Sequence, residues 1–301
     1  MATIYTQKDN NVRKTWFLMA AFLAFFIALG YVFSMIYEDQ SFLYIAVIFS
    51  LAMNFFSYWF ADKIALATSR ARQIQKADNP ELWNVVENLS ITAGLPMPRL
   101  YVIEDPAPNA FATGRNKEHA AVAVTSGLLA VMDRNELEGV LAHELSHIGN
   151  RDILLSTVVV VLVGSVALLA GMFRNSMIFG GRRGRDSGGE AGGILLLIGI
   201  ALSILSPIIA TLIQLAISRR RESLADASGA LLTRYPEGLA SALRKIEAYD
   251  RPMIHANNAT AHLFISNPFG ADHGMLKGIQ KLFMTHPPIE ERIAALEGME
   301  Q

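Results

Sequence analysis

Five consecutive residues, His143-Glu144-Leu145-Ser146-His147, combine side chains that can bind a metal ion with one that can activate water. Residues four positions apart lie on one face of an α-helix, so His143 and His147 can direct two imidazole nitrogens at a single Zn²⁺ ion. Glu144 would lie beside that ion as a base for its water. The alternative is a surface helix with two unrelated histidines, because five-residue patterns also arise by chance.

A hydrolytic zinc site requires a third protein ligand and an open fourth position for water. The segment Glu222-Ser223-Leu224-Ala225-Asp226 places two carboxylates at helical spacing. One carboxylate can bind the metal, with Glu222 as the candidate, and the other can accept the N–H of a ligand histidine. Alternatively, Glu222 pairs with Arg219 or Arg221 at a membrane surface. Asp226 lies in an apolar stretch, where an unpaired carboxylate would be costly.

The elements that must position these residues carry recognisable signals. Asp133 and Glu136 form a capping box that predicts a helix through both histidines, and Asn79-Pro80 opens another that Gly94 ends. Short β-prone runs at Leu100–Ile103 and Ala120–Val124 are joined by what we expect to be a loop. Further helices are expected over residues 222–232, 236–249 and 287–296, with a loop region over 251–272. The histidines His119, His255, His262 and His273 have no partner at ligand spacing and are expected at the surface.

The composition is that of a membrane protein. Of 301 residues, 52% are hydrophobic and only 18% are charged, with a mean hydropathy of +0.31, whereas a soluble domain has about 25% charged residues. The net charge of −1 argues against a nucleic-acid-binding protein. Since cysteine is absent, disulfides, a thiol nucleophile and cysteine metal ligands are excluded.

Two uncharged runs, Thr15–Tyr37 and Ser41–Phe60, are each long enough for a helix to cross a hydrocarbon core of about 30 Å. Lysines and arginines lie before the first run and after the second, and the connecting turn has none. Both ends of this hairpin are therefore expected in the cytoplasm. Two later runs, Ile153–Phe173 and Ile194–Ile217, enclose an arginine-rich link, so whether they cross the membrane stays open. For His147 to meet Glu222, the chain between them must cross an even number of times.

Three motifs together resemble the HtpX family of bacterial membrane-bound zinc metalloproteases, which are related to the CAAX prenyl proteases. The motifs are His143-Glu144-Leu145-Ser146-His147-Ile148-Gly149-Asn150-Arg151-Asp152, Arg221-Glu222-xxx-Asp226 and Thr285-His286-Pro287-Pro288. The resemblance implies a mainly α membrane protein, with transmembrane helices plus a cytoplasmic gluzincin-type zinc metalloprotease domain that has a small β-sheet. It also implies a quality-control role on misfolded or damaged membrane proteins, with the active site at the cytoplasmic side of the inner membrane.

The resemblance assigns the site residues. It implies one Zn²⁺ per chain, bound by His143, His147 and Glu222, with Glu144 as catalytic base and acid. Asp226 would contact a metal ligand and not the metal itself. His286, next to a proline that fixes the backbone, is the candidate for stabilising the oxyanion; the alternative is a histidine that merely begins a helix. Asn109, Ala110 and Phe111 are the candidate edge for pairing with extended substrate backbone, or else an ordinary loop.

The predicted organisation has three parts: a transmembrane hairpin at 1–62, a cytoplasmic metalloprotease domain at 63–152 and 218–301, and a second hydrophobic helical pair at 153–217. Expected partners are misfolded membrane or unfolded proteins and the lipid bilayer, without nucleic acid. An intramembrane protease is disfavoured because the zinc motif has many polar neighbours. A CAAX-type prenyl protease would be expected to carry more spans, and a non-catalytic zinc-binding chaperone would not need Glu144.

Overall fold

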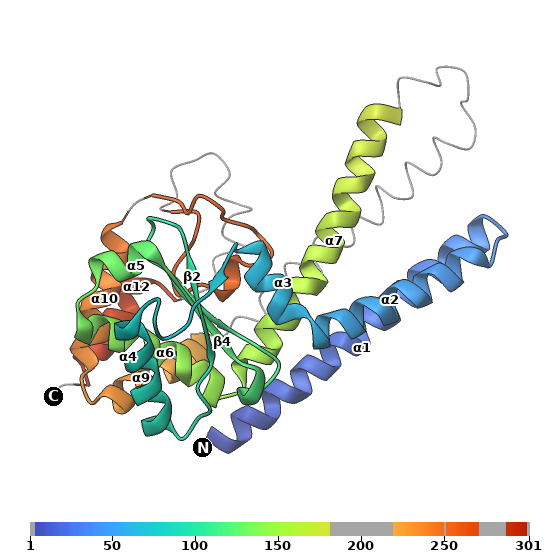
Figure 1. Cartoon of the computed structure of the whole chain (residues 1–301). Coiled ribbons are helices and arrows are strands. Elements are labelled where there is room, and N and C mark those ends of the chain that lie inside the picture. Colours follow the sequence, from blue (N-terminus) through green and yellow to red (C-terminus); the bar gives the residue numbers. More distant parts are fainter. Residues whose placement is uncertain (1–3, 181–218, 250, 271–286, 300–301) are drawn as a thin grey trace.

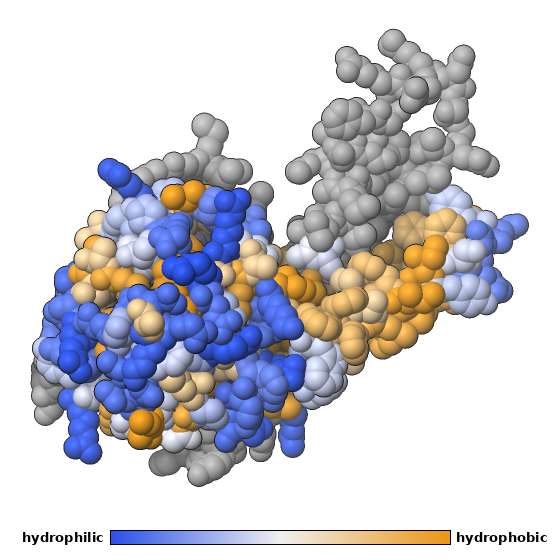
Figure 2. Space-filling view, viewed as in Figure 1, coloured by the Kyte–Doolittle hydropathy of each residue, from blue (hydrophilic) through white to orange (hydrophobic). Residues whose placement is uncertain are grey.

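Two long helices that run side by side project from the globular part of the chain (Figure 1). The computed structural model describes residues 4–180, 219–249, 251–270 and 287–299. The projecting helices are α1 (Ile4–Ile36) and α2 (Ser41–Trp59), and Asn10–Ile36 and Ser41–Trp59 are each long and apolar enough to cross a membrane. Figure 2 shows an apolar band over this hairpin, whereas the visible face of the globular part is largely hydrophilic. The two predicted spans are therefore confirmed as helices, and α1 also extends beyond the first span at its amino end.

A third helix, α7 (Asp152–Gly180), contains the third hydrophobic run and packs against the hairpin. Buried apolar side chains of α1 and α7 form one cluster: Leu18, Met19, Phe22, Phe26, Leu154, Val158, Val159, Leu162, Val163 and Val166. Helix α7 therefore shares an apolar environment with the first membrane helix. The fourth run, Ile194–Ile217, lies outside the described residues.

The globular part is built on a small mixed sheet. Its strands are β1 (Arg72–Gln73), β2 (Arg99–Ile103), β3 (Ala110–Thr113) and β4 (Ala121–Thr125), in the order β1-β2-β4-β3. Strand β2 is parallel to β4, and the two outer pairs are antiparallel. The β-prone runs were thus correctly predicted as strands. The expectation of a plain loop between them is wrong, because the loop contains β3, whose four residues are too few to show a periodic pattern.

Helices cover both faces of the sheet. They are α3 (Ala61–Thr68), α4 (Pro80–Ala93), α5 (Ser126–Val131), α6 (Arg134–Gly149), α9 (Arg219–Thr233), α10 (Pro236–Ala248) and α12 (Ile289–Glu297), with short 3₁₀ turns η1 (Lys117–His119) and η2 (Ala261–Leu263). Successive strand residues point to opposite faces. Leu100 and Val122 accordingly join the main core with α4 and α6, whereas Tyr101 and Ala123 pack with α3 and the end of the η2 segment.

The residues predicted to begin or end helices α4 and α6 do so in the structure. Asn79 accepts a hydrogen bond from the backbone N–H of Leu82 at 3.0 Å, and Gly94 ends α4 in the left-handed region with φ of 64°. Asp133 and Glu136 form both hydrogen bonds of the capping box at the start of α6. Each such cap contributes about 1 kcal/mol to the helix. The helix that carries the histidine motif is therefore fixed at its first turn.

Candidate active site

Helix α6 holds His143 and His147 one turn apart, as their spacing predicts. The Nε2 atoms of the two rings lie 3.1 Å apart. His143 is completely buried, whereas the His147 side chain retains 15% of its exposure. Because both Nε2 atoms converge on one point at the edge of the buried region, they can serve one metal ion.

Helix α9 brings a carboxylate to the same point. The two Glu222 carboxylate oxygens lie 3.7 Å from the Nε2 atoms of His143 and of His147 respectively. The close approach of α9 to α6 depends on Gly229: a Cβ there would lie 3.0 Å from the backbone nitrogen of His143. A side chain at residue 229 would therefore separate the two helices that build the site.

The three side chains fit a zinc ion. Zinc bonds of about 2.0–2.1 Å in tetrahedral geometry place neighbouring ligand atoms about 3.4 Å apart. The observed separations of 3.1 and 3.7 Å bracket that value. Within the described residues, His143, His147 and Glu222 form the one group of metal-ligand side chains that converge in this way.

Each histidine is held at its other nitrogen by an aspartate. Asp226 Oδ1 lies 2.8 Å from His143 Nδ1, and Asp152 Oδ2 lies 3.2 Å from His147 Nδ1. A carboxylate at Nδ1 fixes the tautomer that leaves the Nε2 lone pair available to a metal and makes that nitrogen more basic. The carboxylate–histidine arrangement expected for Asp226 is therefore present, and it occurs twice.

Asp152 reaches His147 because α6 ends between them. Arg151 has a positive φ of 58°, and the axes of α6 and α7 meet at 85°. In an unbroken helix, side chains five residues apart would point in quite different directions. The break therefore turns the first residue of α7 back toward the last turn of α6.

Glu144 lies beside the three candidate ligands, next to the edge strand β3. Its side chain is 1% exposed and receives a hydrogen bond from the backbone N–H of Ala112 in β3. A carboxylate in this position can accept a proton from a water molecule at the ligand cluster. The described residues thus bring together three side chains that could hold a metal ion and a carboxylate that could act as a base beside them, as a metal-dependent hydrolase requires.

A comparison with family models places this geometry in a known family. The model described as peptidase family M48 matches residues 76–300, which contain the triad, Glu144 and the whole sheet from β2 onward. The chain belongs to peptidase family M48. This M48 chain is accordingly a metalloprotease, and its two apolar helices make it a membrane protein.

Curated relatives extend the match to the membrane helices. A protein named Protease HtpX homolog from Caldanaerobacter subterraneus subsp. tengcongensis is 48% identical, over 99% of this chain and 98% of that protein. A protein of the same name from Tropheryma whipplei (strain TW08/27) is 52% identical over 80% of each chain. The resemblance to HtpX predicted from the motifs is therefore confirmed.

A solved structure shares the fold. The crystal structure of S. mikatae Ste24p matches with a TM-score of 0.51 at 20% identity, over 97% of this chain and 67% of that chain. At that identity the likeness shows the fold alone. Together with the described helices and strands, it confirms the predicted fold, which is mainly α-helical with a small β-sheet.

Burial raises the pKa of Glu144, the candidate base. Desolvation, assisted by the nearby Glu222 carboxylate, raises the pKa of Glu144 to about 7, against the opposing effect of His147. A base works best when its pKa lies near the operating pH. Glu144 is therefore suited to exchange protons at neutral pH.

The two histidines have opposite pKa shifts in the metal-free chain. Burial lowers the pKa of His143 to about 4, although Asp226 opposes that shift. Burial also disfavours the charged form of His147, but Glu222, Asp152 and Glu144 outweigh it and raise its pKa to about 9. Burial therefore favours the neutral form of His143, whereas the surrounding carboxylates favour the charged form of His147.

Arg292 is a site residue that the sequence reasoning missed. From α12 it donates two hydrogen bonds to Asp226, from Nε at 2.9 Å and from Nη2 at 2.7 Å, and one from Nη1 to the Ile265 carbonyl at 3.2 Å. Arg292 and His143 together hold the pKa of Asp226 well below its ordinary value, although burial opposes them. A sequence signal did exist: Arg292 lies on the apolar face of its helix, among Ile289, Ile293 and Leu296.

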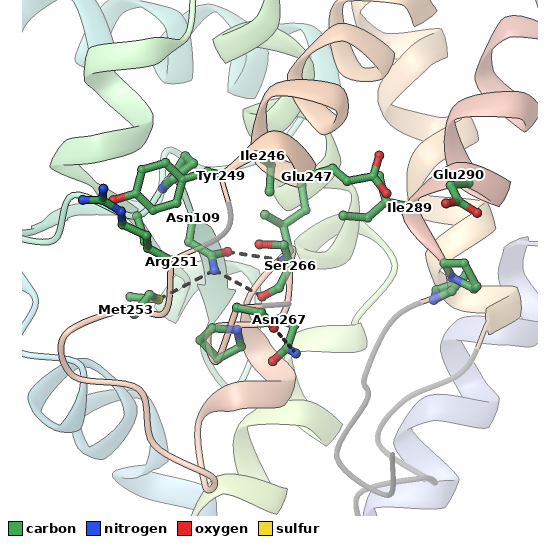
Figure 3. A pocket seen from close by; sticks show the side chains of 17 residues that line it. Asn109, Ile246, Glu247, Tyr249, Arg251, Met253, Ser266, Asn267, Ile289 and Glu290 are labelled. Carbon is green, nitrogen blue, oxygen red and sulfur yellow. Dashed lines mark hydrogen bonds between the residues drawn. The ribbon is translucent and has the colours of Figure 1, made fainter. Parts of the chain in front are cut away.

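The residues predicted to pair with substrate lie in or beside β3. Asn109 donates a hydrogen bond to the Ser266 carbonyl at 3.1 Å and accepts one from the Ser266 N–H at 3.3 Å (Figure 3). The Ala110 carbonyl accepts from the Ile265 N–H at 2.9 Å, and Phe111 is buried against Phe264. Residues 265–266 therefore pair with the outer edge of β3 over its first part.

A pocket of about 320 Å³ opens beside this segment, between the start of β3, the end of α10 and the start of α12 (Figure 3). Asn109, Tyr249, Met253 and Ile289 contribute to its lining. It is an open space adjoining the edge strand that could receive a side chain.

The remaining histidines differ in how exposed they are and in whether the structure describes them. His286 and His273 lie outside the described residues. His119 is exposed and His255 is half-buried. The prediction of a surface position for His262 is wrong: it is 5% exposed, and its Nε2 lies 2.9 Å from the carbonyl oxygen of Ser156. Its neighbours in sequence gave no sign of this, because the contact joins η2 to α7.

Proposed function

We propose that this chain is a zinc endopeptidase that binds one Zn²⁺ through His143, His147 and Glu222 and hydrolyses peptide bonds with Glu144 as base. The observation that supports the proposal best is the convergence of three ligand atoms within 4.8 Å of one another, with a buried carboxylate beside them. The donor set of two imidazoles and one carboxylate is one that catalytic zinc sites use, with the fourth position left open.

Each residue has a distinct task in the proposed reaction. When bound, zinc polarises the scissile carbonyl and lowers the pKa of water. Glu144 takes the water proton and delivers it to the leaving amine. Asp226 and Asp152 hold the two ligand histidines in the required tautomers. We assign His286 to oxyanion stabilisation, since a donor near the developing charge is required.

Substrate is proposed to bind in extended form along β3, with Asn109, Ala110 and Phe111 forming that edge. The side chains of Asn109 and Phe111 make contacts within the fold, so the strand's main chain is the part offered to substrate. Since Ile265 bonds the Ala110 carbonyl, pairing at that oxygen requires Ile265 to move. Pairing nearer Ala112 would place the substrate next to Glu144.

We place the active site at the cytoplasmic face of a bacterial inner membrane, acting on misfolded membrane or unfolded proteins. The lysines and arginines on either side of the first hairpin support this orientation, and the relatives carry the name Protease HtpX homolog. The corresponding division has a hairpin at 1–62, a protease domain at 63–152 and 218–301, and a second hydrophobic pair at 153–217. The packing of α7 against α1 supports a membrane location for that pair.

The alternative functions have weaker support. A CAAX-type prenyl protease would rest on the likeness to Ste24p, which at 20% identity concerns the fold alone. A non-catalytic zinc-binding chaperone would not require a buried carboxylate beside the ligands, whereas Glu144 is 1% exposed there. Neither alternative accounts for the combination of relatives and site as well as an endopeptidase does.

The test is zinc-dependent cleavage of an unfolded protein. Enzyme purified in detergent under chelation is incubated with casein, with and without added zinc, alongside Glu144→Gln. The matched control is Glu138→Gln, which alters a solvent-accessible glutamate of the same helix that pairs with Arg134. We expect zinc to restore cleavage in the wild type and in Glu138→Gln but not in Glu144→Gln. Cleavage that survives in Glu144→Gln would contradict the proposal.

A further inference from the structure

A chain of hydrogen bonds runs from the first membrane helix to a candidate zinc ligand. The Asn11 side-chain N–H of α1 donates to Asp152 Oδ1, and the other oxygen of that carboxylate lies 3.2 Å from His147 Nδ1. The same amide nitrogen lies 3.5 Å from the carbonyl oxygen of Asn150, at the break between α6 and α7. A residue far from the zinc motif in sequence thus contacts the carboxylate that orients one of its histidines.

The contact is buried and specific to this turn of α1. Asn11 is 4% exposed and Asp152 is 3% exposed. Thr15, one turn further along α1, is also buried, but its hydroxyl bonds to the carbonyl of Asn11 within the helix. Asn11 is therefore placed to hold α1 against the α6–α7 break through a polar contact, beside the apolar contacts that α1 makes with α7.

We propose that Asn11 is a positioning residue for the metal site: it fixes the Asp152 carboxylate so that His147 presents Nε2 to zinc. The metal site is then complete only when the first membrane helix is docked on the protease domain. This inference rests on the proposed function, because it takes His147 as a zinc ligand.

The physical reason lies in the two oxygens of one carboxylate. Asp152 must keep Oδ2 aimed at His147, and its plane is fixed only if Oδ1 also has a partner. Without Asn11, Oδ1 would lose a charge-assisted hydrogen bond in a buried place, which is costly. The carboxylate could then rotate toward the nearby positive charge of Arg221, which already interacts with it. Residues that orient metal ligands typically contribute about 10–100-fold to metal affinity.

The experiment measures zinc affinity of the full-length chain in detergent by competition with a chelator of known affinity. Asn11→Leu removes the donor at similar size, and Asn11→Asp is a second variant of nearly unchanged volume, should Asn11→Leu fail to fold. Thr15→Val is the matched control on the same helix. Asp152→Asn and the double variant with Asn11→Leu test whether the two residues act together. The visible absorption of bound Co²⁺ reports ligand geometry independently of activity.

We expect Asn11→Leu and Asn11→Asp to bind zinc about tenfold more weakly and to alter the Co²⁺ spectrum, with Thr15→Val unchanged. The double variant should bind no more weakly than Asp152→Asn alone. Wild-type affinity in Asn11→Leu, or losses that multiply in the double variant, would overturn the inference. If the wild type itself binds no zinc, the proposed function fails instead.

Discussion

The buried ion pair behind His143 yields a quantitative prediction. Arg292 and Asp226, each 3% exposed, are joined by two hydrogen bonds of 2.7 and 2.9 Å. Arg292→Met keeps most of the side-chain volume but leaves the Asp226 charge without its strongest partner. Breaking a buried pair in this way costs about 3–5 kcal/mol. We expect the free energy of unfolding of the metal-free protein to fall by about that amount.

The same variant should weaken the metal site. Asp226 holds His143 Nδ1 at 2.8 Å, so a displaced Asp226 no longer fixes that ring. We expect zinc affinity to fall about 10–100-fold. The double variant Arg292→Met with Asp226→Asn removes the uncompensated charge and should recover part of the lost stability, but it should not recover zinc affinity.

Denaturant titration in detergent at pH 7.5 measures the stability difference, and chelator competition measures the affinity. Arg244→Met is the control, since Arg244 also pairs with two carboxylates, of Glu237 and Glu297, but is 42% exposed. Such exposed pairs contribute about 0–1 kcal/mol. If Arg292→Met is no less stable than Arg244→Met, the assignment of Arg292 as the buried support of the site is wrong.

Three further predictions concern the site. The pKa of the Glu144 carboxyl rises from 4.5 to about 7 on folding, so the metal-free wild type loses about 3 kcal/mol of unfolding free energy between pH 4.5 and pH 8. Glu144→Gln should not show this loss, and equal pH profiles for variant and wild type in unfolding titrations would contradict the prediction. Zinc affinity should rise about tenfold per pH unit between pH 7 and 9, because His147, whose pKa is about 9 without metal, must lose a proton to bind zinc. Calorimetry should detect the release of one proton, and an affinity independent of pH would refute the assignment of His147 as a zinc ligand. Gly229→Val should weaken zinc binding by at least tenfold in chelator competition, because a Cβ there already lies 3.0 Å from the His143 nitrogen and the branched side chain must push α9 away; wild-type affinity would show that α9 does not depend on this contact.

Local signals explain which parts of the fold could be predicted. Three kinds of predicted feature depend only on residues close together in the sequence, and each is found at its predicted position. They are the capping box of Asp133 and Glu136, the caps of α4 and the two apolar runs. The spacing of His143, Glu144 and His147 is likewise a property of one helix. Such features depend on backbone geometry that needs no distant partner.

The parts that escaped prediction depend on contacts between distant segments. Strand β3 exists because its residues pair with β4, and its apolar pattern is too short to show it. Asn11 lies in the polar amino-terminal part of α1, and its contact with Asp152 forms only where α1 meets the α6–α7 break. Arg292 could have been found from the sequence, because it is a charged residue on the apolar face of α12. A buried charge must have a partner.

The most direct test of the central claim is the position of the metal itself. A crystal structure of zinc-loaded Glu144→Gln, with data collected on both sides of the zinc absorption edge, would locate the ion without ambiguity. We predict one anomalous peak per chain, about 2.0–2.2 Å from His143 Nε2, His147 Nε2 and a Glu222 oxygen, with water as the fourth ligand. A peak elsewhere, or a fourth protein side chain closing the coordination, would contradict the account of this site as a hydrolytic zinc centre.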